Sequence, residues 1–169
     1  MRRTSMAEAR FQGLGFILIT VVLGLVLGLI PLPMSVPAEL NYLRPDWLGL
    51  ILAYWLLATP EQMGVVAAFW IGLVADIVFG APFGFHGLNY VLLAALVLSS
   101  YQQLRMLEIW QQALLILFAL ELLTVLQLVM VGVLDDRDQS WLILLRPLTS
   151  ALVWPWVFLL LRAYRRRYV

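Results

Sequence analysis

The chain has 169 residues, of which 63% are hydrophobic and 12% charged, and its mean hydropathy is +0.94. This composition is far more apolar than that of a soluble domain and predicts a polytopic membrane protein, too short for a second sizeable domain. The sequence has no cysteine, and its 11 basic residues are all arginine, which excludes disulfides, cysteine metal sites, Walker-type phosphate loops and lysine Schiff bases.

The apolar segments predict an all-α bundle of about six transmembrane helices, forming one integral membrane domain over residues 1–169. The first, Phe11–Ile30, is an uncharged run of 20 residues. As a helix it would be about 30 Å long, which matches the hydrocarbon core of a bilayer. Prolines end this helix (Pro31, Pro33 and Pro37). Because no small-residue cleavage site follows, we expect it to be retained and not removed as a signal peptide.

The second predicted helix, over residues 46–59, is unusually short. Pro45 and Asp46 favour its start, and it either crosses with little tilt or is re-entrant. The other spans are expected over residues 63–79, 87–101, 109–134 and 141–161. Polar breaks are predicted between the last three spans, at Gln102–Glu108 and Asp135–Ser140.

The arginine distribution predicts how the bundle is oriented. With six spans both termini lie on one side, and eight arginines fall there: Arg2, Arg3, Arg10, Arg105, Arg162, Arg165, Arg166 and Arg167. Three fall on the other side, namely Arg44, Arg137 and Arg146. The positive-inside rule therefore predicts cytoplasmic termini and extracytoplasmic loops at Gly80–Gly87 and Asp135–Gln139. A re-entrant second segment would leave five spans and separate the termini.

An aspartate, Asp76, lies inside the apolar third span. It belongs to a series spaced by four residues: Gly64, Ala68, Gly72, Asp76 and Gly80. On a helix this spacing makes one face of small residues that another helix can approach closely. Asp76 should therefore point into protein, as a structural tie between helices or as a binding or relay carboxylate. Its expected partner is Arg146, at a similar depth, or a polar group of the Gly80–Asn89 loop.

Other polar residues are expected near Asp76, in the outer half of the bundle. The adjoining loop contains Gly80, Pro82, Gly84 and the only histidine, His86, and Arg44, Asp46 and Asn89 fall at the same level. The glycines and proline suit a loop that turns close against the bundle. A single histidine in such a loop indicates a hydrogen-bonding or interface residue more than a metal ligand. Glu121, in the middle of the fifth span, is predicted to be a packed, neutral carboxyl or to face a partner chain.

These residues do not form a convincing catalytic pattern, and we predict no catalytic, cofactor or metal site. An aspartyl protease needs two carboxylates that share a proton, whereas Asp76 and Glu121 are expected at different depths. A serine hydrolase needs a hydroxyl near a histidine, and Ser99 and Ser100 should lie at the opposite membrane face from His86. An intramembrane hydrolase is the weakest of three functional hypotheses.

Three stretches carry a family resemblance: "RPDWLGLILAYW" (Arg44–Trp55), "GLVADIVFGAPFGFHGL" (Gly72–Leu88) and "TSALVWPWVFLLLRAYRRR" (Thr149–Arg167). In this order, the chain resembles the rod shape-determining MreD family over essentially its whole length. The resemblance implies a non-catalytic, multi-pass scaffold in the bacterial inner membrane that supports lateral peptidoglycan synthesis in the cell-elongation complex. It implies MreC as the most direct partner, with MreB, RodA and the RodA-associated transpeptidase, and implies neither a cofactor nor nucleic acid.

The predicted bundle is also similar in architecture to the six-helix substrate-binding subunits of energy-coupling-factor transporters. This similarity implies the alternative function, a small-molecule-binding membrane subunit of a transporter that would use the outer polar residues. In either case, we expect the arginine-rich C-terminus to lie against anionic lipids.

Overall fold

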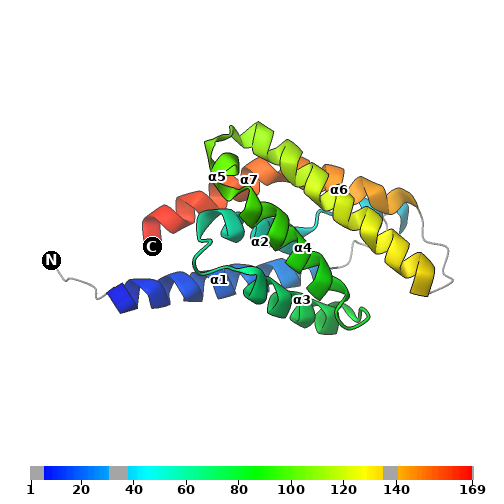
Figure 1. Ribbon diagram of the computed structural model, residues 1–169, viewed down its shortest axis with the longest axis horizontal. Helices are drawn as coiled ribbons and strands as arrows, with labels where there is room; N and C mark the ends of the chain where they lie inside the picture. The colour runs from blue at the N-terminus through cyan, green and yellow to red at the C-terminus, as the bar shows by residue number, and fades with distance from the viewer. Residues whose placement is uncertain (1–5, 31–37, 135–140, 169) are drawn as a thin grey trace.

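The computed structural model describes residues 6–30, 38–134 and 141–168 (Figure 1). Within these ranges the chain forms seven α-helices and two short 3-10 helices, without a β-strand, so the all-α prediction is confirmed. Several predicted features lie outside the described residues, including Arg2, Arg3, the loop prolines from Pro31 to Pro37 and the Asp135–Gln139 loop.

The elements in chain order are α1 (Met6–Leu29), η1 (Ala38–Leu43), α2 (Trp47–Ala58), α3 (Val65–Phe79), α4 (Phe85–Ser99), α5 (Tyr101–Met106), α6 (Ile109–Leu134), η2 (Trp141–Leu144) and α7 (Leu145–Tyr168). The bounds of α6 coincide with those predicted for the fifth span. The polar break predicted at Gln102–Glu108 contains a short helix, α5, over most of its length, which was not predicted. Helix α7 continues beyond the predicted end at Leu161, since arginine is a good helix former.

The long helices run alternately up and down, so that the start of α1 and the end of α7 lie at the same end of the molecule (Figure 1). Neighbours in sequence pack as hairpins, most extensively α3 with α4, then α6 with α7 and α1 with α2. The aspartate end is the end where α3 finishes and α4 begins. The arginine end is the opposite one, where α2 finishes and α6 begins.

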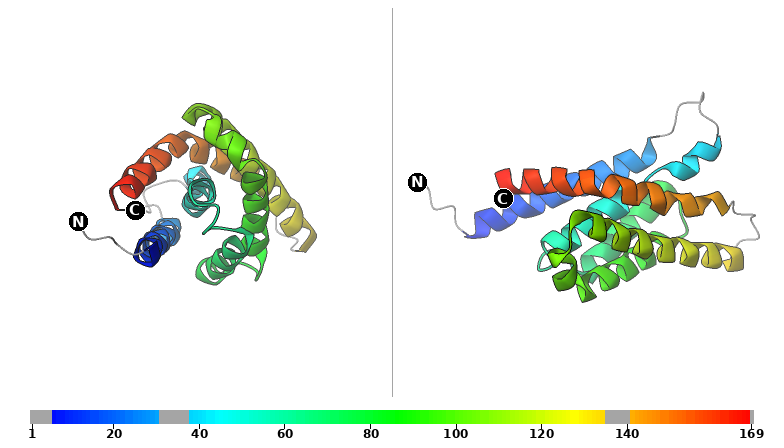
Figure 2. Two further views of the ribbon diagram at one scale, coloured as in Figure 1. Left: turned by 60° about the vertical axis from the view of Figure 1, so that its left-hand side comes forward. Right: turned by 90° about the horizontal axis from the view of Figure 1, so that it is seen from above.

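Helix α2 lies at the centre of the bundle, enclosed by the other helices (Figure 2, left). Every residue from Leu48 to Leu57 is buried, as expected for a helix that is apolar all round. Its 12 residues span only about 18 Å, much less than the hydrocarbon core of a bilayer. Because neighbouring helices shield α2 from lipid, protein groups at membrane depth can bond its unpaired backbone groups.

The outer surface of the bundle is apolar, as a membrane protein requires. Large apolar side chains are exposed along α3, α6 and α7, including Val66, Trp70, Ile77, Phe118, Leu152 and Trp156. Patches of this kind mark contact with lipid or with partner proteins. Within the described residues, two segments are long and apolar enough to cross a bilayer, Ile109–Met130 and Leu142–Arg167, and four shorter apolar helices accompany them. The six-span arrangement therefore stays a prediction.

Candidate functional site

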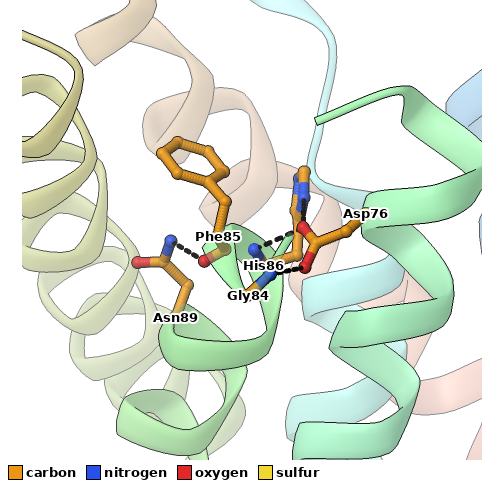
Figure 3. Close-up of polar contacts among 5 residues, drawn as sticks. All are labelled: Asp76, Gly84, Phe85, His86 and Asn89. Carbon is orange, nitrogen blue, oxygen red and sulfur yellow. Dashed lines mark hydrogen bonds and ion pairs between the residues drawn. The ribbon is translucent and has the colours of Figure 1, made fainter. Parts of the chain in front are cut away.

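Asp76 is held by the N-terminus of the next helix (Figure 3). The residue is 1% exposed, near the end of α3. Its Oδ2 accepts a hydrogen bond from the backbone N–H of Gly84 at 2.7 Å. Its Oδ1 accepts one from the backbone N–H of His86 at 2.7 Å and lies 2.9 Å from Nδ1 of the His86 ring. The carboxylate therefore has three polar contacts, all with one short segment.

These contacts make Asp76 the N-terminal cap of α4, supplied from a different helix. The first N–H groups of a helix have no partner within it, and the N-cap residue of α4, Gly84, has no capping side chain. A carboxylate at this point accepts their hydrogen bonds and is stabilised by the positive end of the helix dipole. The tight reversal depends on glycine at two positions, since Gly80 and Gly84 have φ angles of 65° and 92°.

Helices α3 and α4 approach each other closely just behind this cap. A Cβ atom added to Gly72 would lie 2.5 Å from Cα of Gly87 and 2.6 Å from the carbonyl oxygen of His86. The predicted small-residue face is thus a contact face along its middle, where Ala68, Gly72 and Asp76 are buried. At its two ends, Gly64 and Gly80 have open space beside the backbone.

The structure decides between the two expected partners of Asp76. The loop provides the partners, while Arg146 forms no ion pair with Asp76 among the described contacts. Arg146 lies in the first turn of α7, and its Nε is buried without a hydrogen-bond partner in the described part of the chain. The α4 N-terminus is preferred because the tight turn after α3 brings its N–H groups directly over the carboxylate.

Arg146 instead lines a cavity of about 30 Å³ at the aspartate end, which has room for about one or two water molecules. Its polar lining comes from α4, α6, α7 and the start of α2: Asp46, His86, Asn89, Tyr90, Thr124, Gln127, Arg146 and Ser150. Asn89 donates to the carbonyl oxygen of Phe85 at 2.7 Å (Figure 3), and its Oδ1 has no described partner. Sequence reasoning missed Thr124 and Gln127 as a polar pair on α6, although their spacing of three residues places them on one face.

The other predicted outer residues bond helix ends. Asp46 caps α2 by accepting from the backbone N–H of Gly49 at 3.1 Å, and its own N–H donates to Oγ of Ser150 at 2.9 Å. Arg44 donates to the carbonyl oxygens of Leu27 and Gly28, both at 3.0 Å, at the end of α1. The predicted convergence of polar groups at this end is therefore observed for these residues. Pro82 is exposed in the turn, where its carbonyl accepts from the N–H of Phe85 at 3.0 Å.

Glu121 does not belong to this group. It is half-buried on α6 and does not line the cavity, although its neighbours Leu120 and Leu123 do. The geometry therefore gives no pair of carboxylates at Asp76. Within the described residues, no group of three histidine, aspartate or glutamate side chains could hold a metal ion. What the arrangement does is lock three helix ends together with short polar contacts.

Comparison with known proteins identifies the chain's relatives. The family described as "rod shape-determining protein MreD" matches residues 9–164. The chain is also similar to the rod shape-determining protein MreD of Haemophilus influenzae, with 34% identity over 146 residues that cover 86% of this chain and 88% of the relative. No solved structure matches.

Proposed function

The chain belongs to the MreD family of rod shape-determining proteins, and on this basis we propose that it is a non-catalytic inner-membrane scaffold of the bacterial cell-elongation complex. The resemblance carried by three stretches of the sequence is confirmed, and with it a role in cell shape. The scaffold role and the contacts with other proteins are the further step that we propose.

The occupied carboxylate of Asp76 is the observation that favours a scaffold over the alternatives. The carboxylate of Asp76 is buried, and its three polar contacts are all with the start of α4, which supports a structural role over direct contact with a ligand. The cavity beside it, at about 30 Å³, is far below the range of about 300–1,000 Å³ that is usual for small-molecule sites. A transporter subunit that binds its substrate in this cavity beside Asp76 is therefore disfavoured.

We propose MreC as the direct partner, with MreB, RodA and the RodA-associated transpeptidase in the same assembly. The exposed apolar side chains of α3, α6 and α7 offer surfaces on which a transmembrane segment of a partner can pack. Association of this kind needs no ligand and no turnover by this chain.

Depletion of the protein in a rod-shaped host tests the scaffold proposal. Cells should become round and MreC should lose its localisation before peptidoglycan synthesis stops, and MreC should co-purify with the protein in mild detergent. Turnover of a lipid-linked precursor, or cleavage of a peptide bond, by the purified protein alone would contradict the proposal.

We further propose six spans with both termini in the cytoplasm, which puts the aspartate end on the extracytoplasmic side. Because the native chain has no cysteine, single cysteines can report the orientation without background. Phe83, which is 75% exposed in the turn before α4, is a better position than Gly84, where a cysteine would be strained by the φ angle of 92°. With the outer barrier permeabilised, an impermeant thiol reagent should label Phe83→Cys but not Arg166→Cys. The reverse pattern would rule out this orientation.

A further inference from the structure

The arginine end contains a cleft of about 440 Å³ between the end of α2, the start of α6 and the last turns of α7. Its charged lining consists of four arginines and one glutamate: Arg105, Arg162, Arg165, Arg166 and Glu108. Tyr54 and Gln112 are its buried polar residues, and Leu57, Leu107, Ile109 and Phe158 contribute apolar walls. The cleft is therefore strongly basic on one side and apolar on the other.

Two of the arginines have a structural role. Arg105 donates from Nε to the carbonyl oxygen of Leu57 at 2.8 Å and from Nη2 to that of Ala58 at 3.0 Å. Arg165 donates from Nη1 to the same Ala58 oxygen at 2.9 Å. These bonds satisfy the last carbonyls of the short central helix α2, and the positive charges oppose the negative end of its dipole.

The other two arginines have no such partner among the described residues. The guanidinium carbon of Arg162 lies 5.9 Å from the ring centroid of Phe158, and Arg166 is exposed at the rim of the cleft. They contribute little to the stability of the fold, because neither donates a hydrogen bond to the unpaired carbonyls at the end of a described helix. Each therefore has N–H groups available to a bound acceptor.

Two buried side chains point to a ligand independently of the arginines. Tyr54 is 1% exposed and Gln112 is 4% exposed. The Tyr54 hydroxyl and the Gln112 Oε1 have no hydrogen-bond partner within the described residues, although buried polar atoms are nearly always paired. The Tyr54 hydroxyl can donate a hydrogen bond, whereas the Gln112 oxygen can only accept one.

We propose that this cleft binds the headgroup of an anionic phospholipid that carries both a phosphate and a hydroxyl, such as phosphatidylglycerol. Guanidinium groups bind phosphate oxygens in a planar, two-pronged geometry, which suits Arg162 and Arg166, and Tyr54 supplies a further donor. The Gln112 oxygen accepts from a headgroup hydroxyl, and Phe158 and Ile109 contact the acyl chains.

Free phosphate and an acidic protein segment share part of this chemistry. The apolar walls favour the lipid, since neither alternative would use them. In the proposed orientation, on which this point rests, the arginine end lies at the cytoplasmic face, where basic pockets between transmembrane helices bind anionic headgroups. The inference does not depend on the scaffold role, because a transporter subunit with this cleft would bind the same lipid.

Two neighbouring arginines provide a matched test. Arg166 lines the cleft, whereas Arg167 is exposed and does not, so Arg166→Gln and Arg167→Gln change the net charge equally. The full-length protein, delipidated in a neutral detergent, would be titrated with dioctanoyl phosphatidylglycerol, dioctanoyl phosphatidylcholine or inorganic phosphate, with binding followed by native mass spectrometry. We expect phosphatidylglycerol to bind preferentially, with affinity about fivefold weaker in Arg166→Gln and changed less than about twofold in Arg167→Gln.

Tyr54→Phe separates the cleft from general surface charge. It removes only the hydroxyl and keeps the edge-to-face ring contact with Phe158, so the fold should persist while phosphatidylglycerol binding weakens about fivefold or more, as for the loss of a hydrogen bond to a charged group. Equal effects of the two arginine variants, or unchanged binding by Tyr54→Phe, would overturn the proposal. Binding of inorganic phosphate as tightly as the lipid would also overturn it. So would a result in which Arg166→Gln weakens the binding of an oligoglutamate peptide but leaves lipid binding unchanged.

Discussion

The Asp76 site and the arginine cleft, which lie at opposite ends of the bundle, use polar residues in different ways. At the aspartate end, a short carboxylate contacts the next helix at distances of 2.7–2.9 Å, and the adjoining cavity is about 30 Å³. At the arginine end, long side chains reach backbone carbonyls from distant segments, and a cleft of about 440 Å³ stays between them. The Asp76 site thus holds α3 and α4 together, whereas the arginine cleft combines helix capping with groups that can bind a ligand.

The largest expected effect is the loss of the carboxylate at the aspartate end. Asp76→Leu would leave the backbone N–H groups of Gly84 and His86 without an acceptor in a buried site and would remove the contact with the His86 ring, which should destabilise the protein by about 3–5 kcal/mol. Asp76→Asn keeps one acceptor oxygen and should be milder. Thermal unfolding in detergent and steady-state abundance in membranes would measure both effects. If Asp76→Leu had full abundance and normal partner binding but no function, the carboxylate would act on a ligand or a proton instead.

A double variant identifies the partner of Asp76. Combining Asp76→Leu with His86→Leu should recover part of the lost stability, because the half-buried imidazole would no longer lie beside an apolar side chain without its polar partner. Combining it with Arg146→Leu should recover none, because Arg146 does not contact Asp76. The recovered stability is measured as a coupling energy for each pair of residues. Equal coupling energies in the two combinations would show that the carboxylate interacts with Arg146 as well.

Close packing at the aspartate end should give the next largest effect. Gly72→Ala places a methyl group against the backbone of Gly87, and such overpacking costs about 1–3 kcal/mol. Gly15→Ala on α1 is the matched control, because no other atom lies within 4 Å of an added Cβ there. Unfolding temperatures of both variants would test the contrast. Equal shifts would mean that α3 and α4 separate easily at this point.

Loss of the arginine that caps the C-terminus of α2 should destabilise the protein less, because this arginine side chain is more exposed to water than Asp76. Arg105→Met removes the bonds to the carbonyls of Leu57 and Ala58 and should cost about 1–2 kcal/mol. Arg166→Met, which removes no described hydrogen bond, should stay within about 0.5 kcal/mol. Lipid-free thermal stability separates the two residues. A larger loss for Arg166→Met would show that the whole arginine cluster holds the fold.

Local patterns in the sequence predicted much of this molecule. The long apolar run of α6, which contains a single charged residue, Glu121, determined both of its bounds, and the four-residue spacing around Gly72 predicted the close helix contact and the burial of Asp76. Patterns of this kind report on neighbours along one helix. The preference of Asp76 for α4 over Arg146 depends instead on the geometry of one turn, which no periodicity encodes.

Other features were missed because hydropathy does not distinguish a side chain buried in protein from one that faces lipid. The short α2 was therefore predicted as a short span or a re-entrant segment, and its position as the enclosed core of the bundle was not predicted. Helix α5 was missed because it has only six residues, three of which are the polar Gln102, Gln103 and Arg105. The capping of α2 by Arg105 and Arg165 involves partners 47–107 residues apart in sequence, so only the folded arrangement shows it.

The smallest predicted effect compares the two ends within one helix. Asp46 caps the start of α2 through its side chain, while its backbone N–H bonds to Ser150. Asp46→Ala removes only the first of these contacts and should destabilise the protein by about 1 kcal/mol, whereas Asp46→Asn keeps a good capping oxygen and should be nearly neutral. The measured loss for Asp46→Ala should therefore fall at or below that for Arg105→Met. If it were several times larger, or if Asp46→Asn were equally harmful, the negative charge facing the cavity and Arg146 would matter more than the cap itself.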